Sequence, residues 1–552
     1  MLAKTFGSAV HGVNAYLITI EVHADKGTLV NMVGLPDTSV KEAQQRIRAA
    51  FANSGMKNPI RNYTINMAPA DIRKEGTAYD LPLALGLLAA TEQIPSEALS
   101  KYIVMGELSL DGSIRPIKGV LPMAIQAKRD GFEGIIVPIE NAPECAVVDE
   151  LKIYGASCIL DVVNFFKGEG KLESFPFMKE KFQSLQTQHF ALDFTDVKGQ
   201  ENIKRAFEIA ASGGHNLILI GPPGAGKTML AKRLPSILPP LSLDEALETT
   251  KIHSVAGRLK KHDALIVNRP FRNPHHTISD VALVGGGSYP QPGEISLAHN
   301  GVLFLDELPE FKRTVLEVMR QPLEDRNVTI SRSKFSVEYP ASFMLVASMN
   351  PCPCGYFNHP EKECTCGSGV VQRYLSKVSG PLLDRIDLHV EVTPVPFSRL
   401  HEQRSGEPSL TIRERVTQAR AMQSERFNAS KTNYNAQMNT KELKSCCALD
   451  EASSELLKLA MNKLQLSARA YERILKVART IADLDGKERL KALISPKPFS
   501  IGVWIERIGE GEISLFLFHE KNSTPFCFCF ASVDTKRTSS LRKEFSERPE
   551  NA

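Results

Sequence analysis

The sequence predicts a multidomain α/β protein, and three observations lead to that prediction. Short apolar runs rich in β-branched residues alternate with helical patterns over residues 1–167. A strand, a glycine-rich loop and a helix then follow one another over residues 216–237. Residues 398–490 are rich in Ala, Leu, Lys, Glu and Arg, a composition that favours helices. With 552 residues, the chain is long enough for about three or four domains.

Composition excludes several classes of protein. Hydrophobic residues make up 42% of the chain, which is enough to build cores and excludes global disorder. The formal charge of +4 excludes a histone-like polycation but allows local basic surfaces. The longest nearly uninterrupted apolar stretch, residues 81–90, is about half the length of a membrane-spanning helix. Because residues 1–7 also lack a secretory signal pattern, we expect a cytoplasmic protein with no membrane partner.

Residues 1–167 are predicted to form one α/β domain, because β-rich runs and helical patterns alternate along them. The polar residues 168–192 that follow are predicted to be a linker. The expected elements of the domain are strands at residues 15–23, 60–67 and 134–138 and helices at residues 40–54, 80–91 and 120–130.

A glycine-rich loop at residues 221–228 is predicted to bind the phosphates of a nucleotide. It follows an apolar strand and opens a helix, which is the setting that a phosphate-binding loop requires. Its glycines let backbone N–H groups approach phosphate oxygens, and the helix N-terminus adds a favourable dipole. Lys227 is expected to reach the β- and γ-phosphates, and the Thr228 hydroxyl to ligate Mg²⁺. The expected nucleotide-binding residues are Gly221, Pro222, Pro223, Gly224, Ala225, Gly226, Lys227 and Thr228.

Two more buried strands are expected to deliver side chains to the same site. The apolar run 301–305 leads to Asp306 and Glu307, at the strand end where open α/β sheets bind ligands. We expect Asp306 to hold Mg²⁺ through water and Glu307 to act as the general base that polarises the attacking water. On its own, this carboxylate pair could equally mark a helix N-cap. The strand 343–348 leads to Asn350, which is placed to sense the γ-phosphate.

Two arginines outside these strands are candidates for contact with the nucleotide. Arg385 lies in the run Leu382–Asp387, and an arginine on such a segment can reach the nucleotide of a neighbouring subunit. An arginine supplied in this way contributes about 10³–10⁵ in rate. Arg469 and Arg473 lie one turn apart on a predicted helix, so one of them could contact the nucleotide from the helical region. The alternative for each is an ordinary surface arginine.

Together these motifs resemble an AAA+ ATPase with a P-loop core at residues 193–396 and a helical lid at residues 397–490. Further segments resemble the magnesium-chelatase-like branch of that superfamily and, within it, the YifB/ComM family; they lie at residues 269–279, 283–287 and 292–311. The resemblance covers roughly the first 490 residues.

The resemblance implies a chemistry and an assembly. ATP and Mg²⁺ would be the cofactors, Arg385 the arginine finger and Arg469 the second nucleotide sensor. A ring, expected to be a homo-hexamer, would hold nucleotide between its subunits. ComM-type members are DNA-dependent ATPases that migrate branched DNA during recombination and natural transformation. The resemblance therefore implies a DNA-stimulated, helicase-like motor that acts on branched or single-stranded DNA.

A predicted hairpin supports a nucleic-acid substrate. Residues 327–338 alternate like two strands, with a turn near residues 331–334. In related ring helicases, a hairpin at this place in the chain points into the central pore. Arg332 and Lys334 near its tip would then contact DNA phosphates, a contact that is independent of sequence and sensitive to salt. A plain solvated hairpin tip is the alternative.

Four cysteines close together predict a metal site. Cys352, Cys354, Cys364 and Cys366 follow the pattern C-x-C-x₉-C-x-C, with a glycine after each pair. Four thiolates suit a closed, tetrahedral, structural Zn²⁺ site. The alternatives are four free thiols in one loop or an iron–sulfur cluster. Because this insertion follows Asn350, we expect it to brace the sensor or the subunit interface.

The first domain resembles the proteolytic domain of Lon over residues 73–85 and 106–119. That domain uses a Ser–Lys dyad. The resemblance places Ala78 at the serine position and Leu121 at the lysine position, so both catalytic groups are missing and a non-proteolytic domain is expected. Thr77 and Lys118 lie close by in sequence and keep a protease open as an alternative.

Two other functions also remain open. A metal-insertion motor like magnesium chelatase is one, although its motor subunits are expected to lack the first domain, and a protein-remodelling ATPase is the other. Residues 491–552 depart from the family and form a tail of unknown fold, for which a change of reading frame in the gene is one explanation. Within the tail, residues 512–518 and 526–530 are predicted to form apolar strands.

Overall fold

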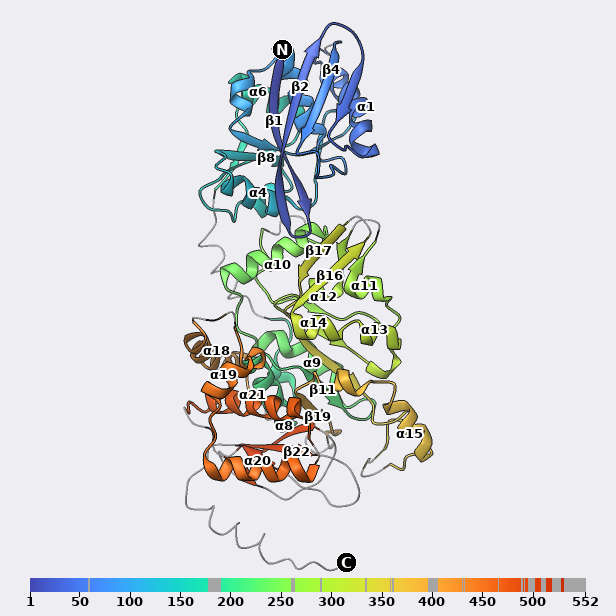
Figure 1. The fold of residues 1–552 in the computed structure, drawn as a ribbon, viewed down its shortest axis with the longest axis vertical. Helices are drawn as coiled ribbons and strands as arrows, with labels where there is room; N and C mark the ends of the chain where they lie inside the picture. The colour runs from blue at the N-terminus through green and yellow to red at the C-terminus, as the bar shows by residue number, and fades with distance from the viewer. Residues whose placement is uncertain are drawn as a thin grey trace, which may run out of the picture.

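The computed structural model is elongated, with the N-terminal domain at one end and the lid helices near the other (Figure 1). It describes residues 1–57, 60–176, 190–259, 264–287, 290–332, 335–357, 359, 362–395, 406–428, 430, 432–464, 466–487 and 490, together with four short strands beyond residue 491.

An eight-stranded mixed sheet forms the first domain, with the order β10-β9-β8-β5-β1-β2-β4-β3. The hydrophobic pattern does not predict β1, because many of its residues are small or polar; antiparallel pairing with β2 along its whole length holds it in the sheet. The strands are β1 (Leu2–His11), β2 (Asn14–Asp25), β3 (Val30–Val33), β4 (Asn62–Ala68), β5 (Tyr102–Val104), β8 (Gly134–Pro138), β9 (Lys152–Ala156) and β10 (Glu173–Phe175), with β6 (Glu107–Leu108) and β7 (Ile114–Arg115) in a small separate hairpin.

Three helices of the first domain confirm the sequence prediction to within two residues at each end. Asp80 at the start of one of them accepts hydrogen bonds of 2.7 and 2.9 Å from Arg46, which ties two helices together. The predicted helices are α1 (Thr38–Asn53), α2 (Asp80–Ala90) and α4 (Val120–Arg129), and the domain adds α3 (Ser96–Leu99), α5 (Ala142–Cys145) and α6 (Ile159–Lys167).

The segment predicted as a linker contributes to the first sheet. Its residues Glu173–Phe175 form β10 and pair antiparallel with β9. Residues 177–189 of the expected linker lie outside the described part of the chain. A 3₁₀ turn at Phe194–Asp196 then opens the next region.

Five parallel strands form the second sheet, in the order β12-β15-β18-β11-β19. Its three expected strands are confirmed, since β11, β15 and β18 overlap the predicted runs closely. The strands are β11 (Leu217–Ile220), β12 (Phe271–Arg272), β15 (Val302–Leu305), β18 (Met344–Met349) and β19 (Leu388–Glu391), and the first helices are α8 (Glu201–Gly213), α9 (Lys227–Ile237) and α10 (Leu243–Val255).

Short elements surround this sheet. The hairpin predicted at residues 327–338 is present, with Asn327 paired to Pro340 and Arg332 paired to Phe335. The remaining elements are α11 (Asp280–Val284), β13 (Gly285–Gly286), β14 (Gln291–Pro292), α12 (Glu294–Leu297), a 3₁₀ turn (Leu308–Glu310), α13 (Arg313–Glu317), α14 (Arg320–Asp325), β16 (Asn327–Arg332), β17 (Phe335–Pro340), α15 (Ser368–Leu375) and α16 (Gly380–Leu383).

Helices form the region that the sequence predicts to be helical. They share one hydrophobic core with a face of the parallel sheet, as Phe207 of α8, Leu217 of β11, Val416 and Ile474 show. Burying such side chains contributes about 1.5–3 kcal/mol each, so the lid is fixed mainly by this core. The helices are α18 (Ser409–Arg426), α19 (Thr440–Cys446), α20 (Glu451–Leu464) and α21 (Ala468–Leu484), with a 3₁₀ turn at Asn435–Gln437.

Two apolar strands predicted in the tail are present. They correspond to β22 (Ile513–Phe518) and β23 (Phe528–Phe530). β22 pairs antiparallel with β21 (Gly502–Arg507), and β23 pairs antiparallel with β20 (Ala492–Ile494).

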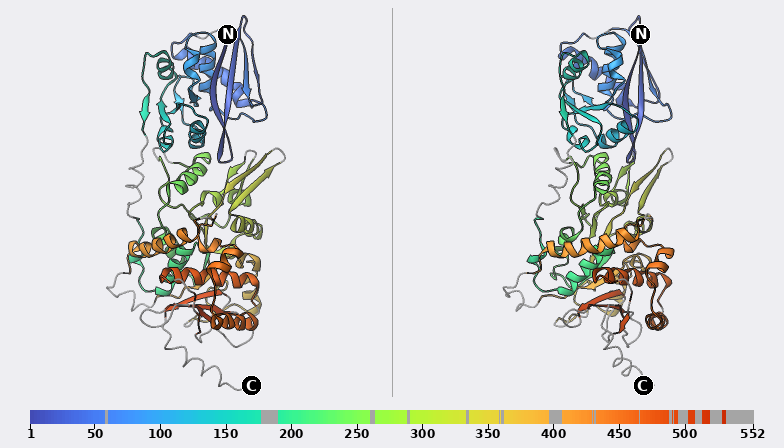
Figure 2. Two further views of the ribbon diagram at one scale, coloured as in Figure 1. Left: turned by 60° about the vertical axis from the view of Figure 1, so that its left-hand side comes forward. Right: turned by 90° about the vertical axis from the view of Figure 1, so that its left-hand side faces the viewer.

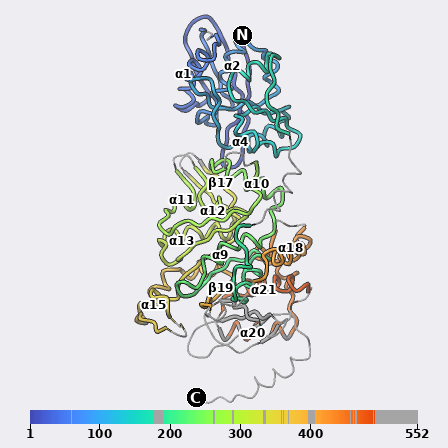
Figure 3. The backbone as a smooth tube through the Cα atoms, turned by 180° about the vertical axis from the view of Figure 1, so that it is seen from behind, coloured from blue at the N-terminus to red at the C-terminus, as the bar shows by residue number. Residues whose placement is uncertain are grey.

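The first domain packs directly against the region that contains the five-stranded parallel sheet. Its helix α4 lies against α10 (Figures 2 and 3). There the Gly119 N–H donates to the Ser254 carbonyl oxygen at 3.2 Å. The tip of the β1–β2 hairpin meets β17, because a Cβ at Gly12 would lie 2.7 Å from Val337 Cγ1. The first domain therefore touches the β16–β17 hairpin.

We expect the thermal stability of the protein to depend on pH through His389 in β19. Burial, and secondarily the charge of Arg473, lowers the pKa of His389 to about 4. The unfolded chain should titrate near the usual value of about 6.5. Stabilisation by the neutral ring is therefore complete above pH 6.5 and is lost as the pH falls toward 4, a total of about 3 kcal/mol.

Melting temperatures of the wild type and of His389→Gln, measured between about pH 7.5 and pH 5.5, check this expectation. The wild type should lose stability more steeply on acidification, because the glutamine cannot take up a proton. Parallel slopes for the two proteins would contradict it.

Candidate functional site

The phosphate-binding loop lies between β11 and α9, as its sequence predicts. Gly224 and Gly226 have φ values of +79° and +89°, which favour glycine, and no atom lies within 4 Å of a Cβ built at Gly224. Gly221 packs so closely against the Val392 carbonyl that a Cβ there would overlap it. The loop therefore needs glycine for two different reasons, one of conformation and one of close approach.

The Lys227 side chain is buried inside this loop. Its ammonium group donates to the carbonyl oxygens of Gly221 and Pro222, at 2.6 and 2.9 Å, and to Asn350 Oδ1 at 3.0 Å. Burial lowers the pKa of Lys227, while the carboxylates of Asp306 and Glu307 oppose that shift. Asn350 follows the last residue of β18, so the structure brings the predicted loop lysine and the predicted sensor together.

A hydroxyl and a carboxylate meet at the predicted Mg²⁺ position. Thr228 Oγ1 donates to Asp306 Oδ2 at 2.7 Å. Ser348, which the sequence did not single out, donates from its buried hydroxyl to Asp306 Oδ1 and accepts the Glu307 N–H at 3.3 Å. Hydroxyl and carboxylate oxygens are the ligands that Mg²⁺ prefers, so the donor set fits this ion. Ser348 acts here as a partner that orients Asp306.

Glu307 occupies an unusual backbone conformation, with φ at +54°. Its carboxylate is largely exposed, and one oxygen lies 3.9 Å from His276 Nδ1. The His276 ring in turn lies 4.1 Å from the ring of His275, centroid to centroid. The predicted general base therefore points into an accessible space and has a histidine as its neighbour, which sequence spacing alone does not reveal.

One of the two predicted arginines lies at the opposite edge of the sheet from this cluster, and the other is exposed on the lid. Arg385 precedes β19, at the N-terminal edge of the parallel sheet, whereas the phosphate-binding loop follows β11 at the C-terminal edge. The Arg385 guanidinium bonds Glu324 at 2.5 Å and is 14% exposed. Arg469 is exposed in the first turn of α21. Its neighbour Arg473 instead donates to the Ile386 carbonyl oxygen at 2.9 Å, a role that the sequence did not predict.

The predicted DNA contacts fall partly outside the described residues. The structure describes the backbone of Arg332 in β16, where it pairs with Phe335. Lys334 lies outside the described part of the chain.

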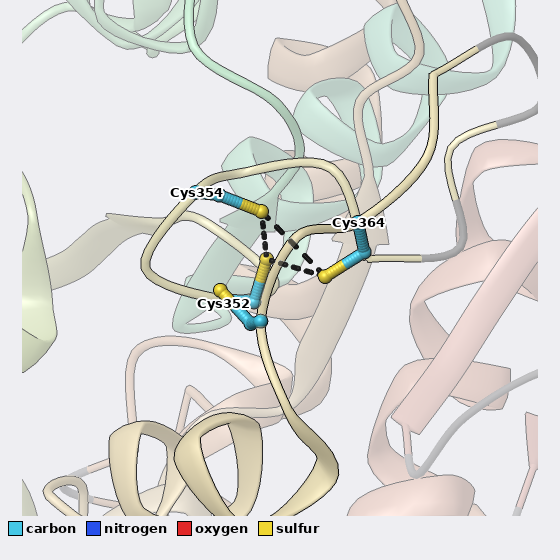
Figure 4. A group of neighbouring side chains, drawn as sticks. Cys352, Cys354 and Cys364 are labelled. Atoms are coloured by element: carbon cyan, nitrogen blue, oxygen red, sulfur yellow. Dashed lines mark hydrogen bonds between the residues drawn. The ribbon is translucent and has the colours of Figure 1, made fainter.

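The four predicted cysteine ligands come together in one loop. Their sulfur atoms all lie within 4.8 Å of one another. Figure 4 shows the sulfurs of Cys352, Cys354 and Cys364 turned toward a common centre.

The Lon-like positions of the first domain carry no catalytic dyad. Leu121 is fully buried in the core of that domain, and Ala78 packs against the same core. The Thr77 hydroxyl donates to the Glu107 carboxylate. The Lys118 side chain lies instead against Gly257, with Cε 2.7 Å from the position of a Cβ there. In the part of the chain that the structure describes, no helix is long and apolar enough to cross a membrane.

Three family models match the chain, and each describes magnesium chelatase. They are "Magnesium chelatase, subunit ChlI" over residues 193–400, "Subunit ChlI of Mg-chelatase" over residues 20–141 and "Magnesium chelatase, subunit ChlI C-terminal" over residues 406–493. The match over residues 20–141 falls within the first domain.

Full-length relatives agree with these matches. The chain is 45% identical to competence protein ComM of Haemophilus influenzae over 493 residues, which are 89% of this chain and 95% of that protein. It is 45% identical to the protein YifB of Escherichia coli over 481 residues, 86% of this chain and 92% of that protein. It is also 30% identical to Lon protease 2 of Bacillus subtilis over 153 residues, 24% of this chain and 27% of that protein.

We expect Ser348→Ala to weaken the response of ATP hydrolysis to Mg²⁺. Without its hydroxyl, Asp306 loses the partner that orients it, so the Mg²⁺ concentration for half-maximal hydrolysis should rise about 10-fold. The measurement is a Mg²⁺ titration at fixed ATP. Thr250→Ala is the matched control, because it also removes a buried hydroxyl but lies in α10, where it bonds only helix and loop backbone. Equal Mg²⁺ responses in the two variants would contradict this role of Ser348.

Proposed function

The chain belongs to the ComM/YifB family of magnesium-chelatase-like AAA+ proteins, and from that membership we propose that it is an ATP-hydrolysing ring motor that acts on DNA. The observation that carries the chemistry is the meeting of Lys227, Thr228, Asp306 and Asn350 at one edge of the parallel sheet. The name of the Haemophilus relative, a competence protein, supports a role in the handling of DNA during transformation or recombination.

Each residue of the cluster has a part in the proposed hydrolysis. The loop amides and Lys227 bind the β- and γ-phosphates, once the ammonium group exchanges its carbonyl partners for phosphate oxygens. Thr228 and Asp306 would hold Mg²⁺, which would supply charge neutralisation on the phosphates. Glu307 accepts a proton from, and orients, the attacking water, and Asn350 positions the γ-phosphate. The exposed carboxylate of Glu307 leaves room for that water.

Assembly into a homo-hexameric ring is part of the proposal, and the position of Arg385 supports it. The arginine lies at the opposite edge of the sheet from its own phosphate-binding loop, so it cannot serve its own nucleotide. In a ring, it would serve the nucleotide of the next subunit as an arginine finger. Arg469, exposed at the start of α21, would contact nucleotide from the lid.

The proposed DNA contact is the β16–β17 hairpin, through Arg332 and Lys334. Basic side chains on a narrow hairpin bind phosphates without regard to sequence, as a motor that moves along DNA requires. The first domain touches this hairpin through Gly12 and Val337, so we propose that it helps to hold DNA or the assembly. Because Ala78 and Leu121 stand at the positions of the Lon dyad, we propose that it has no protease activity.

ATP and Mg²⁺ are the proposed cofactors, with Zn²⁺ at the four cysteines. A metal-insertion motor is the second candidate, because the family models that match the chain describe a magnesium chelatase subunit. Turnover linked to a porphyrin and indifferent to DNA would favour that candidate.

We expect Arg385→Ala to lower ATP turnover by about 10³-fold or more while nucleotide binding is retained, because an arginine finger acts on the transition state. Steady-state hydrolysis and binding of a fluorescent ATP analogue measure the two effects. Glu324→Gln is the matched control, since it removes the same ion pair but keeps the arginine. If the two variants lose turnover equally, the ion pair is what matters and the finger role is wrong.

DNA should stimulate ATP hydrolysis most strongly as a four-way junction, and the stimulation should fall as salt rises. The measurement is turnover without DNA and with duplex, single-stranded or junction DNA over a salt series, with Glu307→Gln as the inactive control. Arg332→Ala should reduce the stimulation and make it less dependent on salt. Robust ATP hydrolysis at the same rate with and without each DNA would contradict the proposal of a DNA motor.

A further inference from the structure

We propose that the four-cysteine loop is a closed Zn²⁺ centre that braces the phosphate-binding loop and Asn350, so that loss of the metal weakens nucleotide binding. The identity of the braced site as an ATP site rests on the function proposed above. The existence of the metal centre does not, because it depends only on the cysteines and their surroundings.

The sulfur atoms are spaced as ligands of one tetrahedral ion. Cys352 Sγ lies 3.2 Å from Cys354 Sγ and 3.6 Å from Cys364 Sγ (Figure 4). Four sulfurs bound at about 2.3 Å to one Zn²⁺ would lie about 3.8 Å apart, whereas the sulfurs of a disulfide lie about 2.05 Å apart. Four thiolates fill the tetrahedron, so no position is open for a substrate and the centre is structural.

Backbone N–H groups surround the sulfurs. The Phe357 N–H donates to Cys352 Sγ at 3.3 Å. Cys354 Sγ accepts backbone hydrogen bonds from Tyr356 and Thr365. Such bonds stabilise the negative charge that a thiolate carries as a metal ligand, and they hold each sulfur in place. The loop is therefore built for thiolates that converge on one cation.

The residues on either side of the first cysteine pair belong to the proposed ATP site or pack against it. Cys352 is fully buried two residues after Asn350, whose side chain accepts the hydrogen bond from Lys227. Gly355, which follows the pair, has a φ of +84° and packs on the phosphate-binding loop so closely that a Cβ would overlap Pro223 Cδ. The turn that begins at the metal centre thus forms one wall of the phosphate-binding loop.

The helix that follows the second cysteine pair also contacts Asn350. The pair leads through Gly367 into α15, and the Tyr374 hydroxyl on that helix accepts the backbone N–H of Asn350. Among the described residues from 351 to 366, none lies in a helix or a strand. In such a segment the free energy of metal binding also stabilises the fold, so the ion holds this wall in place.

Four variants of the full-length protein test the proposal. Gly355→Ala keeps all four cysteines but places a methyl group against Pro223. Gly367→Ala is its control, because Gly367 follows the other cysteine pair, has a φ of −65° and has open space where a Cβ would lie. Cys354→Ser removes a ligand, and Cys446→Ser is the control for loss of a cysteine outside the loop. Elemental analysis gives the metal content, and a fluorescent ATP analogue gives nucleotide affinity.

The wild type and Gly367→Ala should each hold one zinc per chain and bind the analogue equally well. Gly355→Ala should keep its zinc and lose affinity by about 10- to 100-fold, the effect of a displaced binding wall. Cys354→Ser should lose both zinc and affinity, whereas Cys446→Ser should keep both. Melting curves show whether Cys354→Ser folds. If Cys354→Ser does not fold, Gly355→Ala still tests whether the cysteine loop braces the nucleotide site.

Wild-type protein without zinc, or with iron in its place, would overturn the metal centre. Zinc-loaded Gly355→Ala with wild-type affinity would overturn the brace. A wild type that holds one zinc but binds no nucleotide would overturn the proposed ATPase and the brace with it, while the metal centre would stand.

Discussion

The buried side chain of Asn216 joins three strands of the parallel sheet, and the geometry of the ATP site depends on that junction. Its amide nitrogen donates to the Arg385 carbonyl oxygen at 2.8 Å, and its oxygen accepts the Leu345 N–H at 2.9 Å. Each buried group left unpaired would cost about 1–3 kcal/mol, so one residue fixes β11, β18 and β19 against one another. With the strands in that register, Ile220 pairs with Met349, and the loop and Asn350 must leave the sheet side by side.

The same edge of the sheet connects the lid to the arginine segment. His215, next to Asn216, bonds Asp387 at 3.0 Å and Thr480 of the lid helix α21 at 2.8 Å. Arg473 of α21 reaches the carbonyl oxygen of Ile386. The lid helix α21 is therefore linked, directly and through His215, to residues 386 and 387, which adjoin Arg385. These contacts join the lid to the arginine segment within one subunit.

The arrangement of the proposed ATP site could be predicted where it depends on local sequence patterns, but not where it depends on contacts between distant residues. The phosphate-binding loop is contiguous in sequence, and its glycines indicate where the backbone needs a positive φ or a close approach. The contacts of Ser348 and His276 could not be predicted because their partners Asp306 and Glu307 lie far along the chain, and only the fold brings them together. Arg469 and Arg473 share one helix face, so their spacing could not show that Arg473 packs against the turn at residues 383–386.

The ion pair of Arg385 with Glu324 has an energetic consequence for the proposed ring. Glu324 is 51% exposed, and pairs of this kind contribute about 0–1 kcal/mol to stability. An arginine finger that gives 10³–10⁵ in rate supplies about 4–7 kcal/mol of transition-state stabilisation. In the transition state, the stabilisation by the arginine would thus exceed the contribution of the lost ion pair by several kcal/mol. Before a neighbouring subunit assembles, the ion pair with Glu324 keeps the Arg385 guanidinium ordered.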